Sequence, residues 1–213
     1  MLGVQLSVRT RLPKPVVIER GTTDWLRLTT TDAQRVLRQV TRLVADLPRD
    51  SSGDVVWHSG ADELLVRTDQ VTLGLTSGLA TFGIPVGCDQ LVPAARSDRR
   101  ARTSATKSTA ATKPRTAPDQ RVTELVTVPL GVGTTKQVRG LFVSAFDRPA
   151  GPDAVTGTWA DALTAFAWEA LLTLAEHLAA EAGKDRRGRP LVPGAIAAEQ
   201  GALLVKPMAR NEV

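Results

Sequence analysis

A glycine-rich stretch that ends in a lysine, Gly131–Lys136, is the first place where this sequence could do chemistry, as a phosphate-binding loop. A Walker A motif has four residues between its first glycine and the Gly-Lys pair, then Ser or Thr before a helix. Here Lys136 follows Thr135, and a strand pattern begins at Val138. The stretch therefore predicts a glycine-rich hairpin turn over residues 131–137 rather than a nucleotide site.

Three side-chain types of a nucleophilic triad occur together at His58, Ser59 and Asp62. Side chains within one tight turn splay apart, whereas a triad needs groups that converge from separate elements. The segment Gly74–Gly78 also contains a serine, but its spacing does not fit the G-x-S-x-G nucleophile elbow. The pattern favours a hairpin turn and supplies no catalytic residue.

Residues of the types that bind metals are scattered along the chain. A zinc site needs three or four ligands at characteristic spacings. Cys88, His58 and His177 show neither C-x-x-C nor H-x-x-x-H spacing. Glu169 and Thr173 share a helical face with His177, which is typical of the polar stripe of a helix. The sequence therefore predicts no metal and no cofactor.

One stretch, residues 93–120, carries the whole net positive charge, and we call it the basic segment. Its seven basic and two acidic residues give +5, which equals the formal net charge of the chain. It lacks aromatic residues, Leu and Ile and follows no helical or strand period, so it predicts a flexible insertion without a core. Its basic residues are candidate contacts to nucleic-acid phosphates, or they serve only solubility: Arg96, Arg99, Arg100, Arg102, Lys107, Lys113 and Arg115.

A second basic patch follows the last predicted helix, at residues 184–189. We interpret its arginines, Arg186, Arg187 and Arg189, as contacts to a partner molecule. The stretch that follows contains the apolar run 203–205, which could form one further strand.

Two helices must position these groups. In the first, residues 32–47, apolar side chains recur on one face, Thr31 and Gln34 fit a capping box, and Pro48 ends the pattern. The second, residues 159–182, is apolar around most of its circumference. Such a helix usually lies between layers or against a partner.

Strand patterns with a period of two form hairpins over residues 54–86 and return at 122–130 and 138–146. Pro85 predicts that its strand ends at an edge or a bulge. The fold class is therefore α+β, with an antiparallel sheet of about five to six strands packed with two main helices. The following side chains are predicted to share one core: Val36, Leu37, Val40, Leu43, Val44, Leu73, Leu75, Phe142, Phe166, Leu171 and Leu174.

The predicted organisation is a single domain in two parts. Residues 1–92, which begin with an extended arm, form the first part, and residues 121–183 form the second. The basic segment, 93–120, interrupts the domain, and a basic C-terminal tail, 184–213, ends the chain.

Length and composition bound the class of protein. The chain has 213 residues, of which 42% are hydrophobic and 23% charged, which fits one globular domain and excludes a collagen or a coiled coil. A single cysteine, Cys88, cannot form an internal disulfide, which fits a reducing compartment. No signal peptide is found, and Trp159–Ala180 holds too many polar groups for a membrane span. We expect a cytoplasmic protein, or one inside an assembled particle, without membrane insertion.

One stretch is similar to a known family. Val128–Val132, then Val138–Ser144, Arg148-Pro149 and a long Ala/Leu helix resemble the closing third of a GAF sensory domain. The resemblance covers about 60 of the 213 residues and implies a small-ligand pocket between sheet and helices. The earlier part of the chain does not match a GAF core, so no binding residues are carried over.

The leading hypothesis is a non-catalytic subunit or assembly factor of a larger macromolecular complex, such as a phage or phage-like particle. Extended ends, an apolar helix and the basic segment offer contact surfaces, while no catalytic motif is found. Other subunits or a second copy are the expected partners. The alternatives are a GAF-like ligand-sensing or regulatory domain, a sequence-nonspecific nucleic-acid-binding protein, and an enzyme that uses dispersed polar residues.

If the basic segment binds phosphates, the affinity for duplex DNA should fall steeply with salt, with a log-log slope of roughly −6 when all seven cations are engaged. Replacement of Arg96, Arg99, Arg100 and Arg102 by alanine should flatten that slope by about 3 to 4. The melting temperature should hardly change, because exposed charges contribute little to stability. A salt titration of DNA binding measures the slope, and an affinity that is independent of salt would contradict the phosphate hypothesis.

Overall fold

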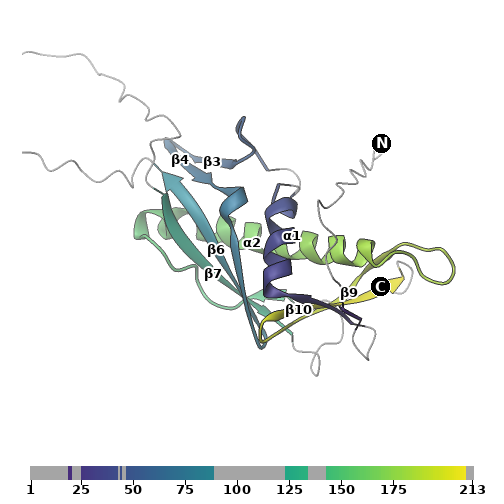
Figure 1. Cartoon of the computed structure of the whole chain (residues 1–213). Coiled ribbons are helices and arrows are strands. Elements are labelled where there is room, and N and C mark those ends of the chain that lie inside the picture. Colours follow the sequence, from purple (N-terminus) through teal and green to yellow (C-terminus); the bar gives the residue numbers. More distant parts are fainter. Residues whose placement is uncertain are drawn as a thin grey trace, which may run out of the picture.

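The computed structural model describes residues 19–20, 25–42, 44, 47–88, 123–133 and 143–209. These residues form two antiparallel sheets and two α-helices (Figure 1). The elements in chain order are β1 (Glu19–Arg20), β2 (Leu26–Thr29), α1 (Thr30–Val40), β3 (Val55–Ser59), β4 (Asp62–Val66), a 3-10 turn (Thr68–Gln70), β5 (Thr72–Thr76), β6 (Leu79–Cys88), β7 (Thr123–Val132), β8 (Val143–Ala145), α2 (Asp153–Glu181), β9 (Leu191–Glu199) and β10 (Ala202–Ala209).

The α+β class with a sheet of five to six strands and two main helices is confirmed. The larger sheet has six strands in the order β3-β4-β6-β7-β8, and β5 pairs with β6 beside β4. A second sheet, which the sequence did not predict, has the order β1-β2-β10-β9. It corrects the expectation of a C-terminal tail, because β9 and β10 form a hairpin and β10 also pairs with β2.

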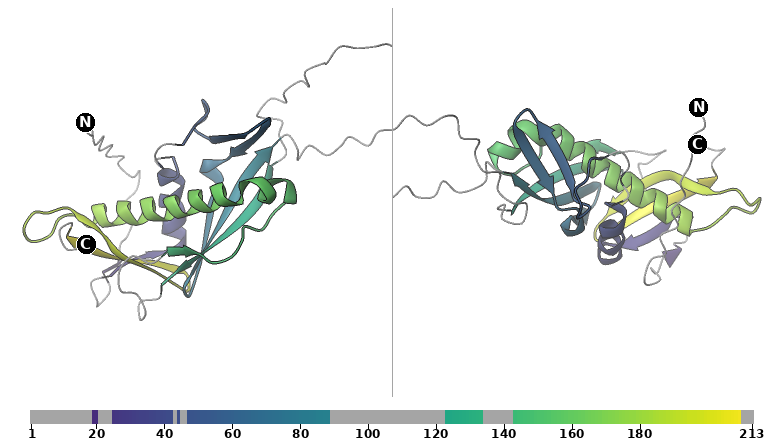
Figure 2. Two further views of the ribbon diagram at one scale, coloured as in Figure 1. Left: turned by 180° about the vertical axis from the view of Figure 1, so that it is seen from behind. Right: turned by 90° about the horizontal axis from the view of Figure 1, so that it is seen from above.

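Helix α2 lies against both sheets and holds them together. It runs along the length of the molecule and crosses the larger sheet and the β9–β10 hairpin (Figure 2). Its first half packs against β3, where Trp159 stacks on Trp57 with ring centroids 6.3 Å apart. Phe166 meets the edge of the same indole, also at 6.3 Å. Burial against the sheets explains the apolar residues on one side of this helix, whereas Trp168 on the other side stays exposed.

Helix α1 differs from its prediction at both ends. Its N-cap is Thr29, whose hydroxyl oxygen accepts a hydrogen bond from the backbone N–H of Asp32, so the Thr31–Gln34 capping box is wrong. It ends at Val40 rather than near residue 47. The Thr41 hydroxyl donates to the carbonyl of Thr68 as well as to that of Leu37, and Arg49 donates to the carbonyls of Thr41 and Val44. These tertiary hydrogen bonds replace the next helical turn.

The Gln34 side chain connects α1 to the start of β5 instead of capping the helix. Its amide nitrogen donates to the Val71 carbonyl at 2.6 Å, and its amide oxygen accepts from the Leu73 N–H at 2.7 Å. Val71 and Leu73 are both buried. One side chain therefore satisfies two backbone groups that would otherwise lack partners at this edge of the sheet.

Strand β6 continues through Pro85, contrary to the prediction that it ends there. The Pro85 carbonyl accepts from Arg67 N–H, so the nitrogen of Pro85 faces the same edge. At that edge β5 pairs with β6 as far as Gly83 and β4 pairs from Val86 onward. The missing N–H of proline therefore falls in the gap between two partner strands and breaks no ladder bond.

One core joins both helices to the sheets, as predicted. Two of the predicted members, Leu43 and Phe142, lie outside the described residues. The other predicted members all belong to one buried cluster: Val36, Leu37, Val40, Val44, Leu73, Leu75, Phe166, Leu171 and Leu174.

Truncation of Leu37 tests this core. Its side chain is fully buried on α1. We expect Leu37→Ala to lower the free energy of unfolding by about 2 to 5 kcal/mol, through lost apolar contacts and a cavity. Arg38→Ala, at an exposed position of the same helix, should change it by less than about 0.5 kcal/mol. Denaturant unfolding followed by circular dichroism measures both, and equal effects would contradict the core assignment.

Gln34→Leu should destabilise the protein although it adds an apolar side chain. The substitution leaves the Val71 carbonyl and the Leu73 N–H without their partner, at a cost of about 2 to 4 kcal/mol. Gln39→Leu on the same helix is the matched control, since the Gln39 amide makes no such bond to β5. Hydrogen exchange at the Leu73 amide should accelerate in Gln34→Leu and not in the control. Unchanged exchange would show that the bond to α1 is dispensable.

Candidate functional site

The basic residues that the sequence analysis named as candidate nucleic-acid contacts lie outside the described residues. The seven Lys and Arg residues of the basic segment lie outside the described residues, as do residues 134–137 of the glycine-rich turn. The described part of that turn ends β7, where Gly133 pairs with Ala197 of β9. The hypothesis that the basic segment binds phosphates therefore stays a prediction.

The hairpin predicted around His58, Ser59 and Asp62 is confirmed. Ser59 and Asp62 form the last pair of the β3–β4 ladder, and Gly60 takes the positive φ of 62° that the tight turn requires. His58 Nδ1 lies 3.6 Å from Glu63 Oε2. Ser59 and Asp62 thus serve the turn, and the geometry brings together no nucleophile, base and orienting acid.

The loop between α2 and β9 presents the second basic patch. Asp185 accepts hydrogen bonds from the backbone N–H groups of Arg189 and Arg187 and from the Arg189 side chain. These bonds, first of all the one from the Arg189 backbone, hold the pKa of Asp185 below its usual value. The loop turns around this carboxylate and leaves Arg186 and Arg187 exposed. Their role as partner contacts stays a prediction.

Among the described residues, no group of three or more His, Cys, Asp or Glu side chains is arranged to hold a metal ion. Cys88 is buried at the end of β6 and His177 lies on α2. Neither of the two described helices is long and apolar enough to cross a membrane.

The side of the strands β5, β6, β7 and β8 that faces away from the helices, which we call the outer face, carries mostly small uncharged residues. Its positions alternate with the core positions of β5, β6 and β7. They are Thr72, Gly74, Thr76, Thr81, Gly83, Pro85, Gly87, Thr123, Leu125, Thr127, Pro129 and Gly131, with Ser144 and Phe146 at the edge of the sheet.

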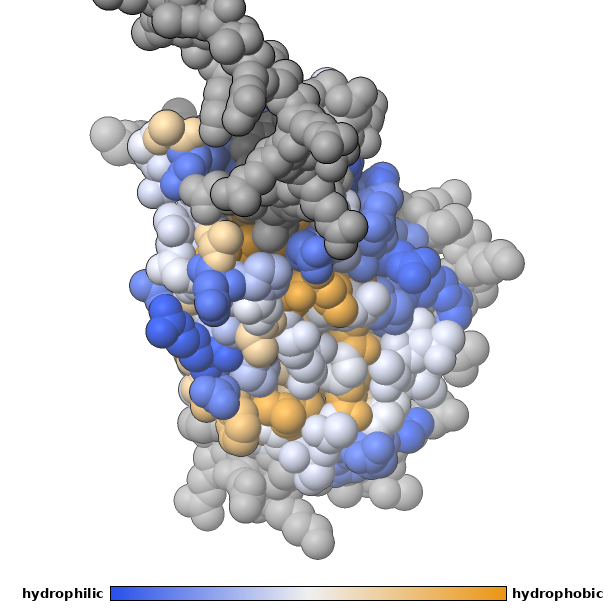
Figure 3. All heavy atoms as spheres, turned by 90° about the vertical axis from the view of Figure 1, so that its left-hand side faces the viewer, coloured by the Kyte–Doolittle hydropathy of each residue, from blue (hydrophilic) through white to orange (hydrophobic). Residues whose placement is uncertain are grey.

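Two large apolar side chains stand on this outer face. Leu125 is 56% exposed and Phe146 is 67% exposed. Glycines lie beneath both: the Cβ position of Gly83 is 3.4 Å from Leu125, and that of Gly131 is 3.8 Å from Phe146. The molecule seen from this side shows apolar and weakly polar residues bordered by hydrophilic ones (Figure 3). Exposed apolar patches are a common feature of the surfaces by which proteins associate.

A bulge interrupts the edge of the sheet next to Phe146. The last hydrogen bond of the β7–β8 pairing runs from Phe146 N–H to the Pro129 carbonyl. Beyond it, the next pair is Thr127 with Ala150. Two extra residues therefore project from the edge strand. Pro129 explains the position, because it has no N–H to donate to β8 at that point.

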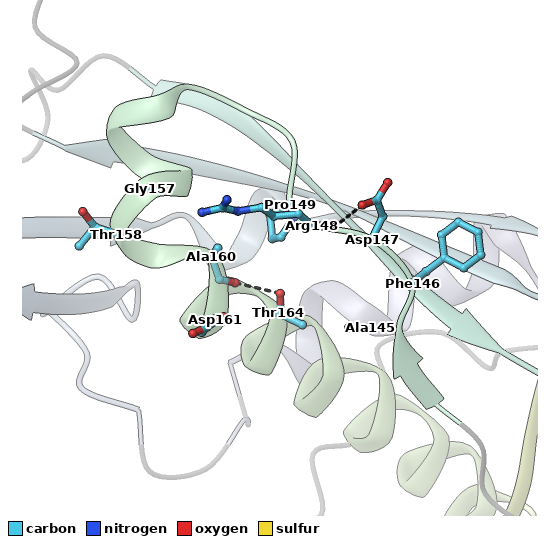
Figure 4. A pocket seen from close by; sticks show the side chains of 10 residues that line it. All are labelled: Ala145, Phe146, Asp147, Arg148, Pro149, Gly157, Thr158, Ala160, Asp161 and Thr164. Carbon is cyan, nitrogen blue, oxygen red and sulfur yellow. Dashed lines mark hydrogen bonds between the residues drawn. The ribbon is translucent and has the colours of Figure 1, made fainter.

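The bulge and the first half of α2 enclose an open hollow of about 440 Å³. Residues 145–149 line it from the sheet edge, and Gly157, Thr158, Ala160, Asp161 and Thr164 line it from the helix. The Arg148 side chain extends across the hollow toward the helical turn of Gly157 and Thr158, whereas the Asp147 carboxylate points the other way (Figure 4). Asp147 Oδ1 accepts the Arg148 backbone N–H at 2.7 Å.

The sequence patterns did not single out Leu125, Phe146, Arg148 or Asp161 as site residues. Leu125 and Phe146 occupy strand positions that alternation alone assigns to a sheet face without saying what covers it. A usable signal was Pro129 in the middle of a strand pattern, since such a proline indicates an edge or a bulge.

No protein-family model matches the chain, and no curated protein or solved structure is significantly similar to it. The family comparison therefore gives no support to the resemblance of residues 128–182 to a GAF domain.

Proposed function

We propose that this chain is a non-catalytic subunit or assembly factor of a larger macromolecular complex and that the outer face is its docking surface. The observation that carries the proposal is the exposure of Leu125 and Phe146 on a part of the sheet where the described positions of β5, β6 and β7 hold no charged side chain.

The energetics of this face favour association. Burial of a leucine or phenylalanine side chain contributes about 1.5 to 3 kcal/mol. The surrounding Thr, Gly and Pro residues lose little side-chain entropy when a partner covers them. In known protein interfaces a few residues contribute most of the binding energy. On the outer face, Leu125 and Phe146 would have that role.

The partner that this chemistry fits is a second copy of the chain. In a twofold dimer the same patch meets itself, and an uncharged patch does so without repulsion between like charges. Nucleic acid is a poor occupant of these strands, because phosphate binding requires cations and the described outer-face positions of β5, β6 and β7 include no Lys or Arg. The buried, unpaired Cys88 is compatible with a complex in the cytoplasm or inside a particle.

The mass of the native particle, measured by native mass spectrometry and light scattering with and without nuclease, tests the proposal. We expect a dimer or larger assembly whose mass does not depend on nuclease. Leu125→Asp should weaken assembly by at least about ten-fold, because a carboxylate replaces an apolar anchor. Ala165→Asp, which adds the same charge at an exposed position of α2, should leave assembly unchanged.

Three results would overturn the proposal. A strict monomer at all concentrations would exclude self-assembly. An assembly that persists in Leu125→Asp would place the interface elsewhere. A mass that collapses on nuclease treatment would instead favour a nucleic-acid-binding protein.

A further inference from the structure

Gly157 lowers the stability of α2, and no neighbouring group requires a glycine at this position. It lies within α2, where glycine is less favourable than alanine by about 1 kcal/mol. Glycines inside helices usually make room for a close neighbour, yet a Cβ at Gly157 would meet nothing within 4 Å. Gly157 lines the hollow beside the bulge. The space above it is open to a molecule from solution.

Arg148 and Asp161 bring opposite charges to this space without pairing. Among the described residues, neither the Arg148 guanidinium nor the Asp161 carboxylate has an ion-pair partner. The two extra residues of the bulge project Arg148 from the sheet edge over α2 (Figure 4). Bulges commonly re-aim a side chain in this way next to binding sites.

We propose that the hollow binds a small zwitterion of the amino-acid type. The planar Arg148 fork suits its carboxylate, because guanidinium and carboxylate form two parallel hydrogen bonds. The Asp161 carboxylate suits its ammonium group. A simple anion would meet the repulsion of Asp161, and a simple cation would meet that of Arg148, whereas a zwitterion satisfies both charges at once.

The size and remaining lining of the hollow agree with this class of ligand. A volume of about 440 Å³ falls at the lower end of small-molecule sites. Thr158 adds a hydroxyl that can donate or accept. Phe146 lies at the rim of the hollow, with its ring turned away from Arg148 and from α2, so the charged and polar groups form the binding surface (Figure 4).

Ligand-detected NMR and calorimetry on the full chain test the proposal with a graded series of ω-amino carboxylates, from glycine to 6-aminohexanoate. One chain length should bind best, because the separation of Arg148 and Asp161 fixes the distance between the two charges. That compound should bind at least about ten-fold more tightly than the acid without the amine or the amine without the acid.

Variants separate the two charges. Asp161→Asn should bind the amino carboxylate no better than the acid alone, and Arg148→Met should bind it no better than the amine alone. Each should weaken binding of the best compound by about ten-fold or more. Asp153→Asn and Arg187→Met are matched controls outside the hollow and should keep the affinity of the original protein.

Gly157→Leu separates loss of binding from loss of stability, because the two should change in opposite directions. The leucine side chain should fill the hollow and abolish binding, while the melting temperature rises by roughly 2 to 4 °C as the helix loses a glycine. The proposal fails if no member of the series binds at millimolar concentration. It also fails if Gly157→Leu, Arg148→Met and Asp161→Asn all leave the affinity unchanged. These tests leave Leu125 intact, so their outcome is independent of the docking surface.

Discussion

The packing of one side of α2 against both sheets is the constraint on which the rest of the structure depends. Its buried residues recur over the whole length from Val155 to Ala179, so neither sheet can move away without exposing part of the helix. The N-terminal half packs against the aromatic ring of Trp57, and the C-terminal half packs against the β9–β10 hairpin. The exposed surfaces are what remains once this burial is satisfied: the outer face, the edge of β8 and one side of α2.

Prolines and glycines determine the shape of those exposed surfaces. Pro85 and Pro129 each lack the N–H that a neighbouring strand would need, and the strands nearby stop or bulge at that point. At Pro85 the consequence is a gap between β4 and β5. At Pro129 it is the bulge that carries Arg148 to the hollow. Glycines on the outer face leave room for Leu125 and Phe146 to lie flat on the strands.

Many acidic and basic residues lie on different parts of the protein. Helix α2 has five acidic residues and no Lys or Arg, so Arg148 is isolated beside an acidic helix. The described outer-face positions of β5, β6 and β7 carry no charged side chain, whereas Glu63 of β4 lies on the same side of the sheet. Positive charge is concentrated in the basic segment and in the loop around Asp185. The two surfaces for which we propose binding therefore differ in chemistry: the outer face is mainly apolar, and the hollow is lined by Arg148 and Asp161.

The sequence by itself determined the two main helices and most strands of the larger sheet, because hydrophobic periodicity and turn residues act locally. It predicted most of α2, which begins at Asp153 rather than at residue 159, as well as the β3–β4 turn. Only the tertiary structure decided that α1 ends at Val40, that Gln34 bonds to β5 and that residues 191–209 complete a second sheet. It also brought Arg148 and Asp161 to one hollow and left Leu125 uncovered. Those outcomes depend on hydrogen bonds and packing between segments far apart in the chain. A local sequence pattern does not specify which distant segment will pack against it.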